Sequence, residues 1–172
     1  MFRSFFSNPV LRFLSTILVL YLLWYLIYDQ WLHPMETIDL IVIDCTIFLS
    51  KTILEALGYT VFTGEERVIG VDGTGGLWIG DNCNGIALFS LFAVFIIAYS
   101  GKPKAKIVYI ILGILSIQLL NVLRVIGLAI LDTHSRAWTE FNHTYTFNIL
   151  IYGYIFFLWM LWVNKYGNTK TI

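Results

Sequence analysis

Long apolar runs constrain the fold of this chain more than any other feature. Three of them cover residues 13–28, 107–131 and 147–163, and a helix of about 20 apolar residues crosses a hydrocarbon core. A fourth run, 85–99, is uncharged and a little shorter, and it can extend through Ser100. Only 13% of the 172 residues are charged and 58% are hydrophobic, so charged side chains cannot cover a water-soluble surface. The composition predicts an all-α polytopic membrane protein with about four transmembrane helices.

The basic residues predict how these helices are oriented. Cytoplasmic loops concentrate Lys and Arg, and the tightest basic cluster is residues 101–106. The two ends of the chain are also basic, whereas all 11 acidic residues lie elsewhere, between Asp29 and Asp81 or at Asp132 and Glu140. We therefore expect residues 101–106 and both ends inside. An even number of crossings then makes residues 38–57, which carry four charges, an interfacial or re-entrant helix on the outer side.

The N-terminal run resembles a signal sequence but predicts a retained anchor. A basic start precedes it, and no small-x-small cleavage site follows it before Pro34. A bacterial cytoplasmic (inner) membrane protein with several spans is the expected class. The 11 basic and 11 acidic residues balance, which gives no compositional case for binding nucleic acid.

The segment 58–82 differs from the rest of the chain because it holds seven of the 13 glycines. Two strand-like runs, Arg67–Asp72 and Leu77–Ile79, flank Gly73–Gly76, and glycine adopts the positive φ angles of a tight reversal. This pattern predicts a small outer β-hairpin directly before Cys83. Internal repeats and low-complexity tracts are absent, so residues 1–172 are expected to form a single integral membrane domain.

Arg124 stands inside an apolar run, where an ionisable group normally faces a bundle interior or a water-filled cavity. One interpretation is that its side chain extends to the outer interface, about 10 Å from the expected helix end. The other is that Gln118, Asn121 and Arg124, spaced by three residues, form a polar stripe that points into the bundle. Three polar groups on one helix face favour the stripe.

The two cysteines have different settings. Cys83 precedes the apolar run 85–99, and the unpaired N–H groups at a helix start favour an anion, which suits a thiolate. Cys45 has largely apolar neighbours and is expected to be a small buried hydrophobic residue. A disulfide between Cys45 and Cys83 is the alternative, because both lie on the oxidising side in this topology.

His143 lies at the outer start of the last apolar run. By itself it is more typical of an interfacial aromatic residue than of a catalyst. The predicted topology, however, brings Cys83, Arg124 and His143 to the outer ends of three helices. A thiolate, an imidazole that moves protons and a guanidinium that holds an oxyanion are the parts needed for acyl transfer through a thioester. A metal site that includes His134 is not expected, because no ligand pair has zinc-like spacing.

These residues together resemble the exosortase/archaeosortase family of membrane transpeptidases. The family carries a Cys-x-Gly motif at a helix start, Asn-x-x-Arg in the next span and a His or Arg at the head of a later span. The matches are Cys83–Gly85, Asn121–Arg124 and His143, in the same order, within residues 68–163.

The resemblance implies a site and a reaction. Cys83 would be the nucleophile, with Arg124 and His143 as catalytic partners and Asn84, Asn121 and Asn142 in support; Asn84 serves either the oxyanion site or the helix cap. The enzyme would process C-terminal sorting signals of membrane-anchored proteins at the outer, periplasmic side of the lipid bilayer, without a cofactor or metal.

The N-terminal half is shorter than is typical of the family. Whether the chain is a minimal subtype that needs an accessory membrane protein is left open at this point. The alternative function is a non-enzymatic membrane subunit of an export or envelope-assembly complex. In that case Arg124 would pair with Asp81, Asp132 or a lipid phosphate, and Cys83 would be replaceable.

Overall fold

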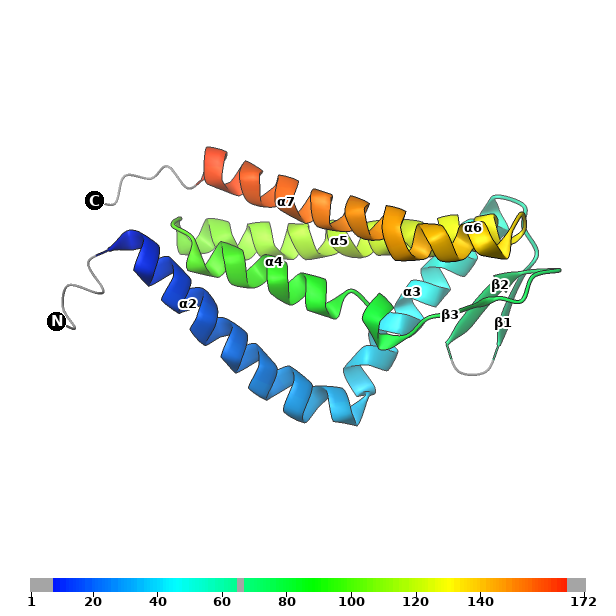
Figure 1. Ribbon diagram of the computed structural model, residues 1–172, viewed down its shortest axis with the longest axis horizontal. Helices are drawn as coiled ribbons and strands as arrows, with labels where there is room; N and C mark the ends of the chain where they lie inside the picture. The colour runs from blue at the N-terminus through cyan, green and yellow to red at the C-terminus, as the bar shows by residue number, and fades with distance from the viewer. Residues whose placement is uncertain (1–7, 65–66, 167–172) are drawn as a thin grey trace.

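The apolar runs form helices in the computed structural model, which describes residues 8–64 and 67–166 (Figure 1). The elements in chain order are α2 (Pro9–Trp24), η1 (Tyr25–Leu32), η2 (His33–Met35), α3 (Thr37–Ala56), β1 (Val61–Gly64), β2 (Val68–Val71), β3 (Leu77–Trp78), η3 (Asp81–Cys83), α4 (Ile86–Ala98), α5 (Pro103–Asp132), α6 (Arg136–Phe141), η4 (Asn142–Thr146) and α7 (Phe147–Lys165).

Among the described residues, three helices are long and apolar enough to cross a membrane: Pro9–Met35, Pro103–Asp132 and Arg136–Lys165. The fourth predicted span is not confirmed, because α4 has 13 residues and a length of about 20 Å. The turn that contains Cys83 uses the residues before Ile86, and Tyr99 is already in an extended conformation. The helix is therefore shorter at both ends than the uncharged run.

α3 packs beside the second half of α5 and is not among the helices that are long and apolar enough to span. Glu36, in the left-handed region at φ 55°, reverses the chain between η2 and α3. Buried positions recur at helical spacing along α3: Asp39, Ile43, Thr46, Ser50 and Leu54. Cys45 lies off this face and is exposed, so the prediction of a buried Cys45 is wrong.

The predicted hairpin forms and gains a strand. β2 and β3 are antiparallel, with Ile69 opposite Leu77, and β1 pairs with the other edge of β2 to give the order β1-β2-β3. Strand β1 was not predicted, because its four residues include a glycine and lack a clear apolar alternation.

α5 contributes to two separate cores. The first lies between α3, the sheet and the C-terminal half of α5: Ile43, Leu54, Ile69, Val71, Ile79, Val122, Val125, Ile126 and Ala129. The second lies between α4, α5 and α7: Phe92, Ile96, Ile117, Ile151, Ile155, Leu158 and Trp162. Gly113 allows the close contact of α4 with α5, because an added Cβ would lie 2.2 Å from the ring of Phe92. The two cores meet near Asn121.

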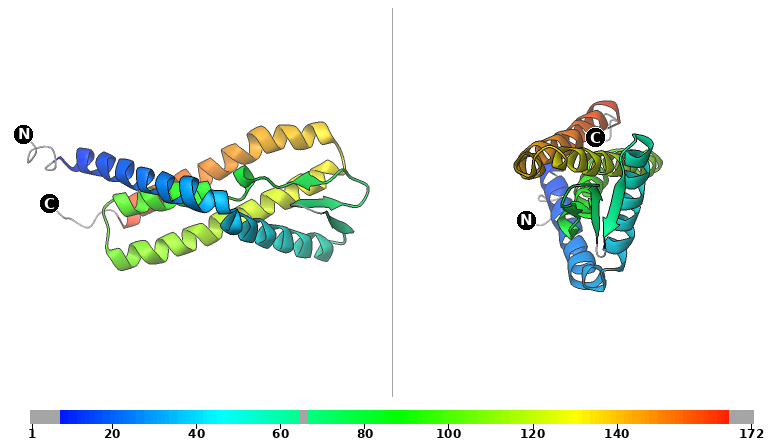
Figure 2. Two further views of the ribbon diagram at one scale, coloured as in Figure 1. Left: turned by 90° about the horizontal axis from the view of Figure 1, so that it is seen from below. Right: turned by 90° about the vertical axis from the view of Figure 1, so that its right-hand side faces the viewer.

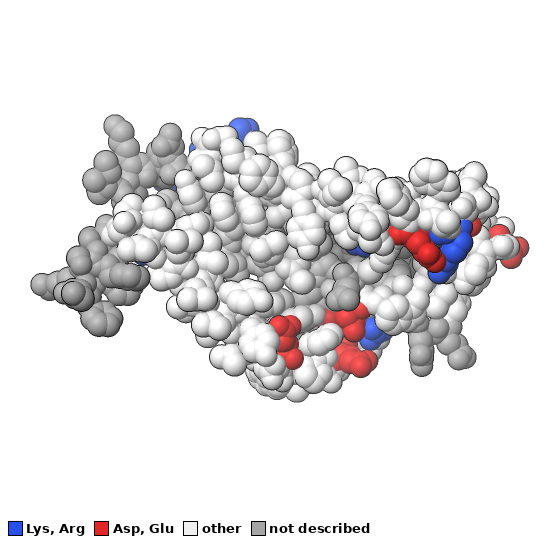
Figure 3. Space-filling model, in the orientation of Figure 1, with Lys and Arg blue, Asp and Glu red and all other residues white. Residues whose placement is uncertain are grey.

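Charge is distributed unevenly along the molecule. The start of α2, the end of α7 and the α4–α5 turn lie at one end, and the sheet lies at the other (Figures 1 and 2). The face over α2, α4 and α7 is almost free of charged atoms, whereas carboxylates gather in the half that holds α3, the sheet and α6 (Figure 3). The chain therefore has an apolar body and a polar end.

Candidate active site

Cys83 occupies a tight turn between the sheet and α4. It ends the short helix η3, and its N–H donates to the carbonyl of Gly80 at 2.8 Å. Asn84 then accepts a hydrogen bond from the N–H of Ile86 at 2.8 Å, and Gly85 adopts a φ of 85°. Glycine is favoured there because a side chain is strained in the left-handed region. This turn accounts for the Cys-Asn-Gly sequence and places the thiol at the junction of the two cores.

The polar stripe on α5 contacts this turn. Asn121 Nδ2 donates to the carbonyl of Cys83 at 2.8 Å, and Arg124 Nη2 lies 4.0 Å from Cys83 Sγ. Gln118, one turn earlier, donates to Thr46 of α3 at 2.7 Å. Asn121 and Arg124 are buried. The stripe points into the bundle, so Arg124 does not extend to the outer interface.

His143 also contacts the thiol. Its Nε2 lies 3.3 Å from Cys83 Sγ. The residue belongs to η4, a π-helical turn in the continuous helix Arg136–Lys165, and such turns are frequent at functional sites. Three segments far apart in the sequence thus bring a thiol, an imidazole and a guanidinium together.

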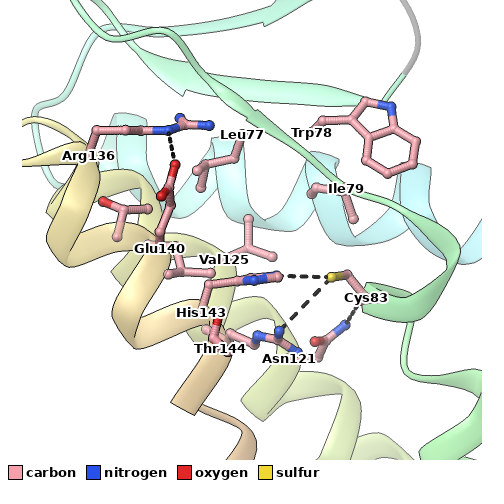
Figure 4. Close-up of a pocket in the computed structure, with 13 residues that line it drawn as sticks. Leu77, Trp78, Ile79, Cys83, Asn121, Val125, Arg136, Glu140, His143 and Thr144 are labelled. Atoms are coloured by element: carbon pink, nitrogen blue, oxygen red, sulfur yellow. Dashed lines mark hydrogen bonds and ion pairs between the residues drawn. The ribbon is translucent and has the colours of Figure 1, made fainter. Parts of the chain in front are cut away.

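The three side chains line one pocket of about 430 Å³ (Figure 4). Its walls are β3, the Cys83 turn, α5 and the α6–η4 helix. Its lining residues are Leu77, Trp78, Ile79, Cys83, Asn121, Arg124, Val125, Leu128, Arg136, Thr139, Glu140, His143 and Thr144. Polar groups lie at both ends, around Cys83 at one and at Arg136 and Glu140 at the other, and Leu77, Ile79, Val125 and Leu128 make up the aliphatic part of the lining.

Arg124 has no carboxylate partner among the described residues. Asp81 pairs with Arg67 at 2.6 Å, and Asp132 pairs with Arg136 at 3.2 Å. A buried guanidinium without a counter-ion carries a large desolvation cost. Asp81 and Asp132, the two possible partners in a purely structural role for Arg124, therefore pair with other arginines. The polar contact of Arg124 is with the Cys83 thiol.

Asp39 is a buried residue that sequence reasoning missed. Its carboxylate, fully buried, accepts hydrogen bonds from the hydroxyl of Tyr28 and from Nδ2 of Asn84, and His33 Nδ1 lies 3.3 Å from its other oxygen. Asn84 therefore caps α4 through its oxygen and binds Asp39 through its nitrogen. The contact ties the N-terminal helix and α3 to the residue that follows Cys83.

Other predicted residues lie outside this arrangement. Asn142 donates to the carbonyl of Trp138 within its own helix at 2.8 Å and does not line the pocket. Cys45 and Cys83 are both free, so the alternative disulfide does not form. His134 is exposed beside Thr133.

The comparison with protein families decides the class of the chain. The model of the transmembrane exosortase family matches residues 1–164. The chain belongs to the transmembrane exosortase family. No curated protein and no solved structure matches the chain.

The match extends further than the short motifs that first suggested an exosortase. Those motifs lie within residues 68–163, whereas the family match begins at residue 1 and includes α2 and α3. In this exosortase the N-terminal half contributes Asp39, which contacts the Cys83 turn directly through Asn84. The N-terminal segment is thus part of the same structural unit as the pocket.

Proposed function

We propose that this exosortase is a cysteine transpeptidase or peptidase that processes C-terminal sorting signals of membrane-anchored proteins. The observation that carries the proposal is the position of Cys83 Sγ, 3.3 Å from His143 Nε2 and 4.0 Å from Arg124 Nη2 in one pocket. A thiol within hydrogen-bond distance of a general base is the arrangement expected of an activated nucleophile.

The reaction proceeds in two steps. The Cys83 thiolate attacks the scissile carbonyl, and the guanidinium of Arg124 stabilises the negative charge on the carbonyl oxygen. The C–N bond then breaks, His143 in its protonated form gives a proton to the leaving amine, and a thioester remains on Cys83. An acceptor amine or water attacks the thioester, His143 takes the proton of this nucleophile, and the thiolate departs.

The charge pattern supports an orientation for this chemistry. Three Lys residues at the start of α5, beside the α4–α5 turn, lie at the opposite end of the molecule from the sheet and α6 (Figure 1). Because basic loops remain in the cytoplasm, we propose that the pocket opens on the periplasmic side of a bacterial inner membrane. Exported substrates with a C-terminal apolar helix would present their sorting signal there.

Coexpression with a candidate substrate tests the proposal. The substrate is a surface protein from the same genome that ends in a short motif, one apolar helix and a basic tail, with a tag after the tail. The wild type and Cys45→Ala should release the tagged tail, whereas Cys83→Ala should insert normally and release none. Mass spectrometry should find the acyl group on Cys83. Normal processing by Cys83→Ala would reject the enzymatic function and favour the membrane subunit.

A further inference from the structure

The pocket is a groove between β3 and the α6–η4 helix. Leu77 and Ile79 face Arg136, Glu140 and His143 across it, whereas the indole ring of Trp78 points away from them (Figure 4). At one end Arg136 Nη1 donates to the carbonyl of Gly76 at 3.0 Å, and at the other Cys83 meets His143. Within the described residues β3 is an edge strand, because β2 lies on one side of it and no strand lies on the other.

The sheet register shows which main-chain groups of β3 face the groove. Ile79 N–H donates to the carbonyl of Arg67 at 2.8 Å, and the register then places Trp78 opposite Val68. Hydrogen-bonded and non-hydrogen-bonded pairs alternate along an antiparallel ladder. Trp78 is therefore at a non-hydrogen-bonded position, and its N–H and C=O point away from β2.

The contact of Gly76 confirms that this free edge faces α6. Gly76 precedes the strand, and its carbonyl belongs to the same peptide unit as the Leu77 N–H, which faces β2. The Gly76 carbonyl therefore points to the other side, where it accepts from Arg136. The next outward pair of groups on this edge belongs to Trp78. No hydrogen bond from another part of the described chain reaches the Trp78 N–H or C=O.

The length of the groove fits a short extended peptide. Arg136 and His143 are seven positions apart, which corresponds to roughly 10 Å of helix. An extended chain rises about 3.3 Å per residue, so about three residues span this distance. Val125 and Leu128 of α5 are buried and apolar and line the same groove. Side chains of one face of such a peptide would rest on them.

We propose that about three residues of the substrate, in extended conformation, add to the free edge of β3 and pair with the Trp78 N–H and C=O. This deepens the proposed function and rests on it. Strand addition supplies affinity through main-chain hydrogen bonds and leaves selectivity to alternate side chains. Because β3 leads into the Cys83 turn, the paired segment delivers its next carbonyl to the thiol.

A proline at position 78 tests the main-chain contact. Trp78 N–H lies outside the β2–β3 ladder, so Trp78→Pro removes the proposed donor without removing a sheet hydrogen bond, as proline allows on an edge strand. Trp78→Val is the matched variant, because it also loses the indole ring but keeps the N–H. Both variants are prepared as the full chain in detergent. The rate at which each reacts is measured with two reagents, acetyl-Ala-Ala-Ala-chloromethyl ketone and iodoacetamide. Each reagent forms a carbon–sulfur bond with the Cys83 thiolate and releases its halide, and only the first has a peptide backbone.

Trp78→Pro should react about three- to tenfold more slowly than Trp78→Val with the tripeptide reagent, the range for one lost hydrogen bond. The two variants should react alike with iodoacetamide. Equal rates with the tripeptide reagent would overturn the proposal. If Trp78→Pro also disturbs iodoacetamide labelling, a second comparison uses the wild type and a tripeptide reagent that is N-methylated at every alanine. The methylated reagent should react more slowly than the unmethylated one. Equal rates would reject strand addition.

These outcomes distinguish a failure of the strand-addition proposal from a failure of the proposed enzymatic function. If tripeptide labelling depends on position 78 but Cys83→Ala still processes sorting signals, the proposed function fails and the peptide groove stands. If Cys83→Ala abolishes processing but position 78 has no effect on tripeptide labelling, the nucleophile stands and strand addition fails.

Discussion

Arg124 combines burial, a positive charge and contact with a thiol. A guanidinium has several donors in a fixed plane and can hold an oxyanion while it contacts the thiol, whereas a lysine offers a point charge. We expect Arg124→Lys to slow thioester formation about ten- to a hundredfold, near the range for the loss of an oxyanion donor. Single-turnover acylation measures this. Arg12→Lys on α2 is the control, and near-native turnover of Arg124→Lys would contradict the oxyanion role.

In the proposed reaction His143 supplies the proton that the leaving amine requires, because a guanidinium keeps its proton at neutral pH. His143→Ala should lower turnover about a hundredfold and change substrate binding far less. His134→Ala is the matched control, since His134 is exposed and does not line the pocket. Steady-state kinetics of both variants test this assignment, because a loss of proton transfer lowers kcat and leaves KM nearly unchanged. Similar behaviour of the two variants would rule out a proton-transfer role for His143.

We expect Asp39 to act as a positioning residue, because it binds Asn84, the residue that follows Cys83. Asparagine has nearly the same shape as aspartate but lacks its charge and replaces one acceptor oxygen with a donor. Because Tyr28 and Asn84 both donate to Oδ1, the new amide either removes the acceptor that they share or takes the place of the oxygen beside His33. Asp39→Asn should lower the free energy of unfolding by about 1–3 kcal/mol, the cost of unsatisfied buried groups. Thermal unfolding in detergent measures this, and Asp44→Asn, exposed on the same helix, is the control.

The same variant distinguishes positioning from stability alone. Iodoacetamide labels both cysteines, so Cys45 in the same chain is an internal standard for Cys83. Asp39→Asn should alter the ratio of the two labelling rates at a temperature where the protein remains folded. An unchanged ratio would limit Asp39 to a structural role.

At the scale of the elements, the crossing of α4 and α5 depends on one glycine. Gly113→Val places carbon atoms where the ring of Phe92 lies, and overpacking of this kind costs about 1–3 kcal/mol. Gly153→Val on α7 is the control, because its Cβ position has no neighbour within 4 Å. Both variants change helix propensity equally. Thermal unfolding should therefore show a lower midpoint for Gly113→Val than for Gly153→Val.

Sequence patterns predicted the elements whose polarity contrasts with their surroundings. Arg124 and Asn121 stand out because apolar residues flank them, and the glycine cluster separates the β2 and β3 runs. Asp39 does not stand out, because residues 38–57 carry three other charges and the partners of Asp39 come from distant segments. Asn142 is polar and lies at the same end of its helix as His143, but its side chain donates to the backbone carbonyl of Trp138. Contacts of this kind are set by packing and not by local composition.

The extent of α4 illustrates a second limit. A count of uncharged residues overestimates the length of a helix when a turn takes up the first of them. Gly85 belongs to the apolar run by composition and to the Cys83 turn by conformation. The positions of α5 and α7 were predicted closely, because no such turn interrupts their apolar runs.

At the scale of the whole molecule, the pocket lies in the polar half and the basic turn at the opposite end. The described Asp and Glu residues are in η1, at Glu36 before α3, in α3, in the turn after β2, in η3, at the end of α5 and in α6. Lys102, Lys104 and Lys106 are instead at the start of α5. Because basic loops remain inside, this separation predicts residues 29–82 and 132–142 outside and 101–106 inside.

Cysteine labelling on intact cells tests this topology. Cys45 and Cys83 are replaced by Ser, and single cysteines are introduced at three exposed positions as Asp72→Cys, Lys104→Cys and His134→Cys. A membrane-impermeant maleimide should label positions 72 and 134 on intact cells and position 104 only after permeabilisation. Labelling of position 104 from outside would invert the topology. The pocket would then open to the cytoplasm, where exported proteins do not present a processed C-terminal signal.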